Sequence, residues 1–184
     1  PEDICDKMIE FYNLNKHKHT TGMAYNEITL HNIDTTVKQS TDLHLQPNVD
    51  LYPLNLYHEA LQKCILNYQE KYDEVKNLPK FNITETYNIQ HYEKGGGFKR
   101  WHYEGGNSEE PIIKKRLIVF MTYLNDVDDG GTEFKYQNLT TPAKKGLTLI
   151  WPVWWTHTHR GQVSHTKEKY IITGWYSKVE NENS

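Results

Sequence analysis

The apolar pattern of the chain changes its period near Pro79, and this change limits the folds that the chain can adopt. Before Pro79, hydrophobic side chains recur every three or four residues in residues 4–11 and 54–75, as on one face of a helix. Proline cannot continue a helix and biases Leu78 towards an extended backbone, so we expect the longer helix to end before it. After Pro79, shorter apolar runs alternate with turn residues. Helices therefore precede strands.

Four runs in the second part of the chain have the pattern of β-strands. They cover residues 83–89, 116–124, 147–151 and 170–176. In the first run, Ile83, Tyr87 and Ile89 are expected to share one face. Glycine-rich segments between the runs predict turns at residues 95–97, 105–106, 129–131 and 145–146. Such segregation indicates an α+β chain whose β part is a sandwich or barrel, with the helices packed on one outer face.

The length of 184 residues fits one domain that buries a core without disulfides or structural metals. We expect a single domain over residues 1–184. In it, residues 1–81 supply helical support and a candidate lid segment, and residues 82–178 form the β core. Residues 13–53 have the least regular pattern, which fits either edge strands or a loop that covers a pocket.

The charge balance argues against partners that attract a basic surface. The formal net charge is -3, with 21 Lys and Arg against 24 Asp and Glu, so we expect no nucleic-acid partner. No apolar run approaches the roughly 20 residues that span a bilayer, and the N-terminus lacks a signal-peptide pattern. Cys5 and Cys64 lie in helical patterns, where a buried thiol is commoner than a disulfide. We therefore expect a soluble cytoplasmic protein without a membrane partner.

The triplet His102-Tyr103-Glu104 places an imidazole and a carboxylate two residues apart. On an extended segment both side chains leave the same face and converge on one point. A second imidazole would complete a facial triad that leaves positions open for a co-substrate and O2, an arrangement that suits Fe(II). His157 and His159 are both candidates, and on a strand they would point the same way. Because an H-x-E triplet also arises by chance, the surrounding motifs matter.

Four further blocks surround this triplet in a fixed order. They are a Tyr and a glycine-rich turn in residues 92–98, a strand with Tyr-Leu-Asn followed by Gly-Gly in residues 116–134, the pair Trp151-Pro152, and His159, Lys169 and Trp175 at the end. In this order the blocks resemble the prolyl 4-hydroxylase-like branch of the Fe(II)/2-oxoglutarate oxygenases. The resemblance covers about half of the chain. It implies a double-stranded β-helix, a jelly-roll barrel like that of the cupins, with the metal inside its mouth.

The resemblance also implies which imidazole binds the metal. In this family the basic residue that binds 2-oxoglutarate follows the distal histidine by ten positions, as Lys169 follows His159. We therefore take His102, Glu104 and His159 as the catalytic metal ligands, and His157 as a residue that either supports a ligand or lies at the pocket rim. Lys169 would pair with the distal carboxylate of 2-oxoglutarate, because a buried lysine is costly without an anion.

Other pocket residues follow from the same resemblance. Tyr92 and Tyr123 resemble tyrosines that hydrogen-bond to 2-oxoglutarate, and Thr173 would assist Lys169. Core packing is the alternative for each tyrosine. Lys167 is the competing candidate for the cationic role. Arg116 fits either a pocket role or a structural one.

Glu104 departs from the family pattern, in which an aspartate follows the first histidine. The extra methylene moves the carboxylate further from the backbone, and the alternative to a working ligand is a degraded, inactive site. Aromatic residues near the ligands form a candidate floor for proline or another planar group, or are buried in the barrel. They are Trp101, Tyr103, Trp154 and Trp155.

The implied activity is that of a dioxygenase that hydroxylates an unactivated C–H bond and releases succinate and CO2. Its requirements would be Fe(II), 2-oxoglutarate and O2, with ascorbate as a candidate reductant. A peptidyl proline is the first candidate substrate, and other peptides, proteins or small molecules are alternatives. Two other classes compete with this hypothesis: a metal-binding cupin-like isomerase or binding module without 2-oxoglutarate chemistry, and a catalytically silent β-sandwich interaction domain.

Overall fold

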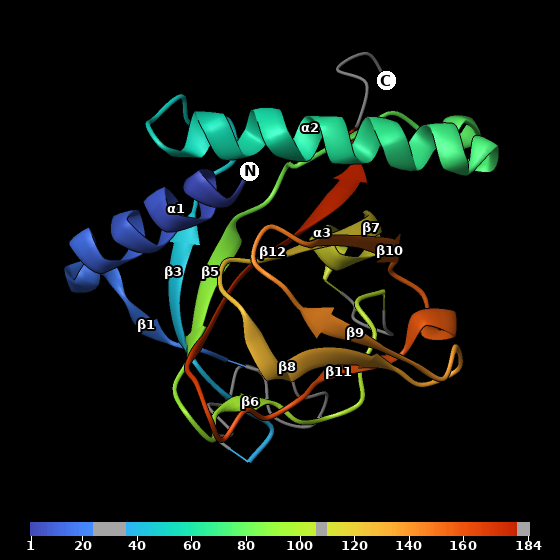
Figure 1. Ribbon diagram of the computed structural model, residues 1–184. Coiled ribbons are helices and arrows are strands. Elements are labelled where there is room, and N and C mark those ends of the chain that lie inside the picture. The colour runs from blue at the N-terminus through green and yellow to red at the C-terminus, as the bar shows by residue number, and fades with distance from the viewer. Residues whose placement is uncertain (24–35, 106–109, 180–184) are drawn as a thin grey trace.

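The computed structural model describes residues 1–23, 36–105 and 110–179 (Figure 1). Its α-helices are α1 (Glu2–Leu14), α2 (Leu54–Lys71) and α3 (Pro111–Lys114), and its short 3-10 helices are η1 (Lys16–Lys18), η2 (Asp73–Asn77) and η3 (Trp155–His157). No helix in these ranges is long and apolar enough to cross a membrane.

The strands form three antiparallel sheets. The largest has the order β1-β3-β5-β12-β7-β10, with β4 also paired to β12; the others are β11-β8-β9 and β2-β6. The strand bounds are β1 Thr20–Thr21, β2 Lys38–Gln39, β3 Thr41–Leu45, β4 Phe81–Asn82, β5 Tyr87–Tyr92, β6 Gly97–Phe98, β7 Arg116–Tyr123, β8 Val127–Phe134, β9 Leu139–Ala143, β10 Thr148–Pro152, β11 His159–Gly161 and β12 Lys169–Lys178.

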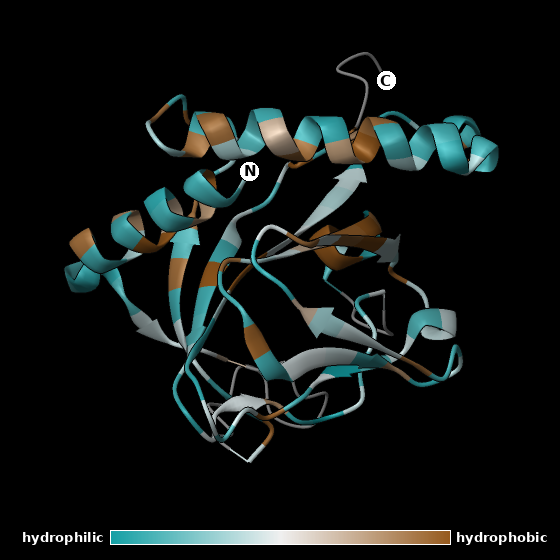
Figure 2. Ribbon diagram, viewed as in Figure 1, coloured by the Kyte–Doolittle hydropathy of each residue, from teal (hydrophilic) through white to brown (hydrophobic). Residues whose placement is uncertain are grey.

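Helices α1 and α2 cover one face of the largest sheet (Figure 1). Alternate side chains of the central strands, such as Ile89, Phe120 and Ile172, pack with Met8 and Leu61 of these helices. Figure 2 shows hydrophilic and hydrophobic segments alternating along both helices, as expected when one helix face is buried. The helices therefore shield one outer face of the β part, as the sequence predicts.

The opposite face of the same strands forms a second core. Its buried members come from several strands and include Tyr92, Val119, Met121, Phe134 and Trp151. Because successive residues of a strand point to opposite faces, the central strands contribute to both cores. Figure 1 shows β8, β9 and β11 on the side of the barrel away from the helices. The architecture is the predicted α+β fold with a double-stranded β-helix.

The N-terminal part also supplies strands to the barrel. Strands β1 and β3 from residues 13–53 extend the largest sheet, with Leu43 opposite Ile89 of β5. The sequence left open whether this segment forms edge strands or a loop that covers a pocket, and the structure shows that it contains strands of the sheet. Residues 24–35 of the segment, and Gly106 of a predicted turn, lie outside the described residues.

The longer helix ends before Pro79 as predicted, although earlier than its apolar pattern, and the first predicted strand is divided. The α-helix α2 ends at Lys71, and η2 continues the path until Leu78, which is extended as expected before a proline. Ile83 does not share a strand with Tyr87, because the backbone bends between β4 and β5. This bend buries the carboxylate of Glu85.

The segment Asp129-Gly130-Gly131 is not the predicted turn but part of β8. A Cβ at Gly131 would lie 2.0 Å from the carbonyl oxygen of Thr141 in β9. The glycine is therefore needed because two backbones approach closely, whereas Gly95 and Gly146 do occupy turns, with φ of 82° and 80°.

Candidate metal and co-substrate site

A cavity of about 640 Å³ lies inside the barrel. Its wall includes the inward-facing residues of β12, which are Lys169, Ile171, Thr173 and Trp175, together with residues of β5, β7, β10 and β11. All seven residues that the sequence predicts for the metal and co-substrate sites line this cavity; they are Tyr92, His102, Glu104, Tyr123, His159, Lys169 and Thr173.

Backbone hydrogen bonds bring the metal-ligand candidates together. The N–H of His102 donates to the carbonyl of His159 over 3.0 Å, and the N–H of His159 donates back to the carbonyl of His102 over 2.9 Å. The N–H groups of Glu104 and Gly105 both donate to the carbonyl of Val153, over 3.1 and 2.9 Å. The chain before η3 and the start of β11 therefore hold the H-x-E segment in place.

The ligand atoms of His102, Glu104 and His159 all lie within 4.8 Å of one another. Oε1 of Glu104 is 3.3 Å from Nε2 of His102 and 3.8 Å from Nε2 of His159. Within the described ranges this is the one group of three His, Cys, Asp or Glu side chains arranged to hold a metal ion.

The other nitrogen of each imidazole is engaged by the backbone. Nδ1 of His102 lies 2.9 Å from the carbonyl oxygen of Arg100, and Nδ1 of His159 lies 2.8 Å from that of His157. Each Nδ1 therefore carries a hydrogen, so that in the neutral form of either ring the lone pair of Nε2 is directed at the cluster.

The electrostatics of the cluster favour metal-binding protonation states. Burial works to raise the pKa of the Glu104 carboxyl, but its hydrogen bond to His102 and the charges of His102, His159 and Arg116 outweigh burial and hold this pKa at about 2. Burial, assisted by the charge of His102, lowers the pKa of His159 to about 4. At neutral pH the site thus offers a carboxylate and a neutral imidazole, the forms that bind a metal ion.

Oε2 of Glu104 has partners of its own. The indole N–H of Trp175 donates to it over 3.0 Å, and a guanidinium nitrogen of Arg116 lies 3.6 Å away. Arg116 also forms a bidentate pair with the buried carboxylate of Glu85, at 2.9 and 2.6 Å. Arg116 therefore has both of the roles considered for it. It lines the cavity, and its ion pair joins β7 to the segment before β5.

His157 does not lie on a strand beside His159. It belongs to η3, which turns the chain before β11 begins, so the condition under which both side chains would point the same way is not met. His157 contributes its carbonyl oxygen to orient His159, while its own Nδ1 lies 3.1 Å from the Thr156 hydroxyl.

Lys169 is 4 % exposed, whereas the rival Lys167 is exposed to solvent. Its ammonium donates to the carbonyl oxygens of Gly130 and Gln162, over 2.8 and 2.9 Å. An ammonium has three donors, so one remains for a ligand in the cavity. Burial lowers the pKa of Lys169 to about 8, and the carboxylate of Asp129 opposes this shift. The structure thus places a cation at the inner wall of the cavity, and no carboxylate of the described residues is bound to it.

The predicted hydroxyl groups surround this region. The hydroxyl of Tyr92 donates to the side-chain oxygen of Gln90 over 2.6 Å, and that of Tyr123 lies 2.6 Å from the Thr132 hydroxyl. Burial raises the pKa of both tyrosines. The hydroxyl of Thr173 donates to the carbonyl of Phe120 over 3.3 Å.

The four aromatic residues near the ligands are not buried in the barrel. Trp154 and Trp155 are 52 % and 60 % exposed, and Tyr103 is 38 % exposed. Trp101 is stacked against Arg160, whose guanidinium carbon lies 4.5 Å from its ring. Only Trp101 and Tyr103 line the cavity itself.

Sequence reasoning missed several residues of this site. Trp175 was recognised as a motif residue, but its hydrogen bond to Glu104 was not; the signal was its position on the same strand face as Lys169. No sequence pattern marked three other residues as part of the site, namely Gln162, Thr132 and Glu85. Their contacts join segments whose spacing in the sequence is irregular.

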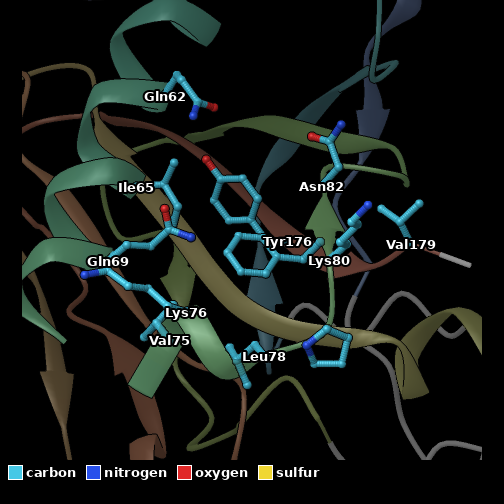
Figure 3. Close-up of a pocket in the computed structure, with 12 residues that line it drawn as sticks. Gln62, Ile65, Gln69, Val75, Lys76, Leu78, Lys80, Asn82, Tyr176 and Val179 are labelled. Atoms are coloured by element: carbon cyan, nitrogen blue, oxygen red, sulfur yellow. The ribbon is translucent and has the colours of Figure 1, made fainter. Parts of the chain in front are cut away.

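A second cavity of about 510 Å³ lies between α2, η2 and the end of β12. Figure 3 shows Ile65 and Gln69 of α2 on one side of the Tyr176 ring, and Lys80 and Asn82 on the other. Since Tyr176 and Trp175 are successive strand residues, this cavity opens on the sheet face opposite the metal-ligand candidates. Among the residues that the structure describes, its lining includes no His, Cys, Asp or Glu.

The donor set of the first cavity fits Fe(II). Two imidazoles and one carboxylate on one side of a cavity leave positions open for a chelating ligand and O2, and this set is typical of non-haem Fe(II) oxygenases. The cation of Lys169 in the same cavity fits a ligand with a second carboxylate.

The chain was compared with known families, proteins and structures. The sequence pattern of a family described as the 2OG-Fe(II) oxygenase superfamily matches residues 87–177, about half of the chain. Among curated protein sequences, none is similar enough to count as a match.

Solved structures share the fold at low sequence identity. A viral collagen prolyl hydroxylase from Paramecium Bursaria Chlorella virus-1, in complex with 2OG, is 18% identical with a TM-score of 0.69, over 97% of this chain and 92% of that one. A prolyl-4-hydroxylase from Pseudomonas putida is 13% identical with a TM-score of 0.68, over 97% and 86%. A Trichoplax adhaerens prolyl hydroxylase, in complex with a hypoxia inducible factor peptide fragment, is 11% identical with a TM-score of 0.70, over 95% and 76%.

The family match covers the part of the chain that contributes all of the metal-ligand candidates, and the structural likeness extends over nearly the whole chain. The chain belongs to the 2OG-Fe(II) oxygenase superfamily, and Fe(II) and 2-oxoglutarate are the cofactor and co-substrate that this membership implies.

Proposed function

We propose that this oxygenase hydroxylates an unactivated C–H bond of a polypeptide, with a proline as the first candidate residue, and releases succinate and CO2. The observation that carries the proposal is one cavity that contains both a His-Glu-His cluster and a buried lysine. Because β1 and β3 pair within the same sheet as β5, the proposal treats the chain as one oxygenase domain.

In this proposal each side chain has a defined task. Nε2 of His102, Nε2 of His159 and Oε1 of Glu104 would hold the iron, and Lys169 would bind the distal carboxylate of 2-oxoglutarate. With iron bound, the chemistry supplied there is oxidative decarboxylation of 2-oxoglutarate coupled to hydroxylation of a C–H bond. The protein fixes the geometry, and the apolar side chains of Met121, Trp151 and Ile171 help to exclude water.

A polypeptide substrate is supported by the surface beside the cavity. Trp154, Trp155 and Tyr136 are more than half exposed, and the rings of Tyr136 and Trp155 meet edge to face with centroids 6.1 Å apart. Their neighbours Lys135 and Thr158 line the cavity. A small molecule inside the cavity would not reach these rings, whereas an extended chain could, and exposed aromatic residues are typical of proline-binding surfaces.

The solved structures add support for the same substrate class. The names of three similar structures describe prolyl hydroxylases, one of them bound to a peptide fragment. For this chain a prolyl peptide is the proposal that these names suggest, and the exposed rings are the feature of its own surface that agrees with it.

The test is a hydroxylation assay with proline-containing peptides, Fe(II), 2-oxoglutarate and O2. We expect one oxygen atom to be added at proline, in step with succinate formation, and no addition when that proline is replaced by alanine. The variant Trp155→Ala should weaken peptide hydroxylation while leaving 2-oxoglutarate binding unchanged. Peptide-independent hydroxylation of a small molecule, unaffected by Trp155→Ala, would contradict the polypeptide proposal.

A further inference from the structure

We infer that Glu85 is a positioning residue for the candidate metal site, because it restrains Arg116 and thereby keeps one carboxylate oxygen of Glu104 available to a metal ion. The inference rests on the proposed function, since it takes the His-Glu-His cluster as the metal site. Glu85 lies in the bend between β4 and β5, outside every motif of the sequence and outside the cavity lining.

The first link is a buried ion pair between Glu85 and Arg116. Oε1 and Oε2 of Glu85 accept hydrogen bonds from two guanidinium nitrogens, over 2.9 and 2.6 Å. Glu85 is 7 % exposed, and the hydroxyl of the fully buried Ser177 donates to its Oε1 over 3.2 Å. A bidentate pair of this kind fixes the plane as well as the position of the guanidinium.

The second link joins Arg116 to Trp175. The guanidinium carbon lies 3.5 Å from the centroid of the indole ring, so that the cation covers one face of the ring. With this face covered, the indole is held at an orientation in which its N–H donates to Oε2 of Glu104 over 3.0 Å.

The third link divides the two oxygens of Glu104 between different tasks. Oε2 is taken by Trp175 and lies 3.6 Å from the nearest Arg116 nitrogen. Oε1 faces the imidazoles instead, 3.3 Å from His102 and 3.8 Å from His159. The carboxylate is thus oriented to offer one oxygen to a metal ion.

Arg116 lies between two carboxylates, and this position explains why Glu85 matters. A partly buried guanidinium that loses its bidentate partner seeks another carboxylate, because an unpaired buried charge is costly. Glu104 is a second carboxylate beside it. Without the charge of Glu85, Arg116 would draw closer to Glu104, form the fork-like pair itself and compete with the metal ion for Oε1.

The chain length of Glu104 agrees with this arrangement. The contact between its Oε2 and the indole N–H needs a carboxylate that reaches Trp175 on β12. An aspartate at this position is one methylene shorter and would withdraw the carboxylate from the indole. The glutamate of the H-x-E pattern and its contact with Trp175 are therefore parts of one series of contacts, and Glu85 lies at the end of this series that is farthest from the metal ligands.

The experiment measures Co(II) binding to the metal-free protein by calorimetry and by the ligand-field absorption of the bound ion, which reports on the ligand set. Glu85→Gln keeps the shape of the side chain and removes its charge. We expect Glu85→Gln to weaken Co(II) binding on the order of tenfold and to change the absorption spectrum, which is the usual scale for residues that orient metal ligands. Asp6→Asn, which removes an exposed ion pair with Lys145, is the matched control and should change neither.

The double variant Glu85→Gln/Arg116→Gln separates positioning from a structural role. If Glu85 acts by restraining Arg116, removing the guanidinium should restore part of the lost Co(II) affinity. A purely structural pair would give a double variant at least as impaired as the single one. Trp175→Phe, which keeps an aromatic ring and removes the N–H, should change the Co(II) spectrum in the same direction as Glu85→Gln. It tests the contacts between Arg116, Trp175 and Glu104 even if Glu85→Gln fails to fold.

The outcomes distinguish this inference from the proposed function. Wild-type protein that binds no Co(II) would overturn the metal site, and the inference with it. Wild-type binding together with unchanged affinity and spectrum in Glu85→Gln would overturn the inference alone. Loss of affinity that the double variant does not restore would also overturn it.

Discussion

The main chains of His102 and His159 hydrogen-bond to each other in both directions, with N to O distances of 3.0 and 2.9 Å. This isolated antiparallel bridge joins segments that are far apart in the sequence. Because the backbone sets the separation of the two imidazoles, replacing one side chain should remove a ligand without moving the other. The candidate site can therefore be tested one residue at a time.

The first prediction concerns the two distal histidines. His159→Ala should abolish metal binding, because its Nε2 faces Glu104 and the residue is only 6 % exposed. His157→Ala should retain most of the affinity, since His157 contributes only its backbone carbonyl to the orientation of His159. Calorimetric titration with Mn(II) measures both variants. The reverse ranking would show that the wrong histidine has been chosen.

The second prediction is a pH dependence of 2-oxoglutarate binding. The pKa of Lys169 is lowered to about 8 by burial, so without ligand its ammonium loses its proton as the pH rises through this value. Binding of the dianion needs the charged form. Affinity should be flat between about pH 6 and pH 8 and fall above it by up to about tenfold per pH unit.

Two variants of Lys169 control this experiment. Lys169→Arg keeps a permanent charge and should bind with no such decline, whatever its absolute affinity. Lys169→Met should weaken binding by at least about tenfold at neutral pH, since a buried anion would lose its cation. A decline above pH 8 that persists in Lys169→Arg would assign the titration to another group.

The third prediction is a stability difference between two glycines. Gly131→Ala should destabilise the fold by about 3 kcal/mol, because the added Cβ would meet the Thr141 backbone at 2.0 Å. At Gly161 the nearest atom is 3.7 Å from the added Cβ, an ordinary contact, so Gly161→Ala should cost less than about 1 kcal/mol. Urea unfolding of the metal-free proteins measures both, and equal losses would contradict the close approach of β8 and β9.

Much of the fold could be predicted from the sequence because alternation along strands is a local signal. In β12, Lys169, Thr173 and Trp175 share the inward face, and the adjacent Tyr170 and Ile172 pack on the helix side. The order of motifs around His102 then identified the candidate ligands and the pocket cation, and the structure brings these residues into one cavity.

The features that escaped prediction depend on neighbours distant in the sequence. Gly130-Gly131 has the composition of a turn, and only the approach of β9 makes it part of a strand. His157 looked like a strand residue because η3 has no sequence signal of its own. The pairing of Glu85 with Arg116 depends on the bend before β5, which local pattern does not encode.

The central claim is that His102, Glu104 and His159 hold an iron ion to which 2-oxoglutarate binds. Its most direct test is an anaerobic titration of 2-oxoglutarate into the wild-type protein and into His159→Ala, each with and without Fe(II). The wild-type protein should bind 2-oxoglutarate tightly only with Fe(II) present, and His159→Ala should lose this metal-dependent binding. Wild-type protein that binds Fe(II) but not 2-oxoglutarate, or an unimpaired His159→Ala, would contradict it.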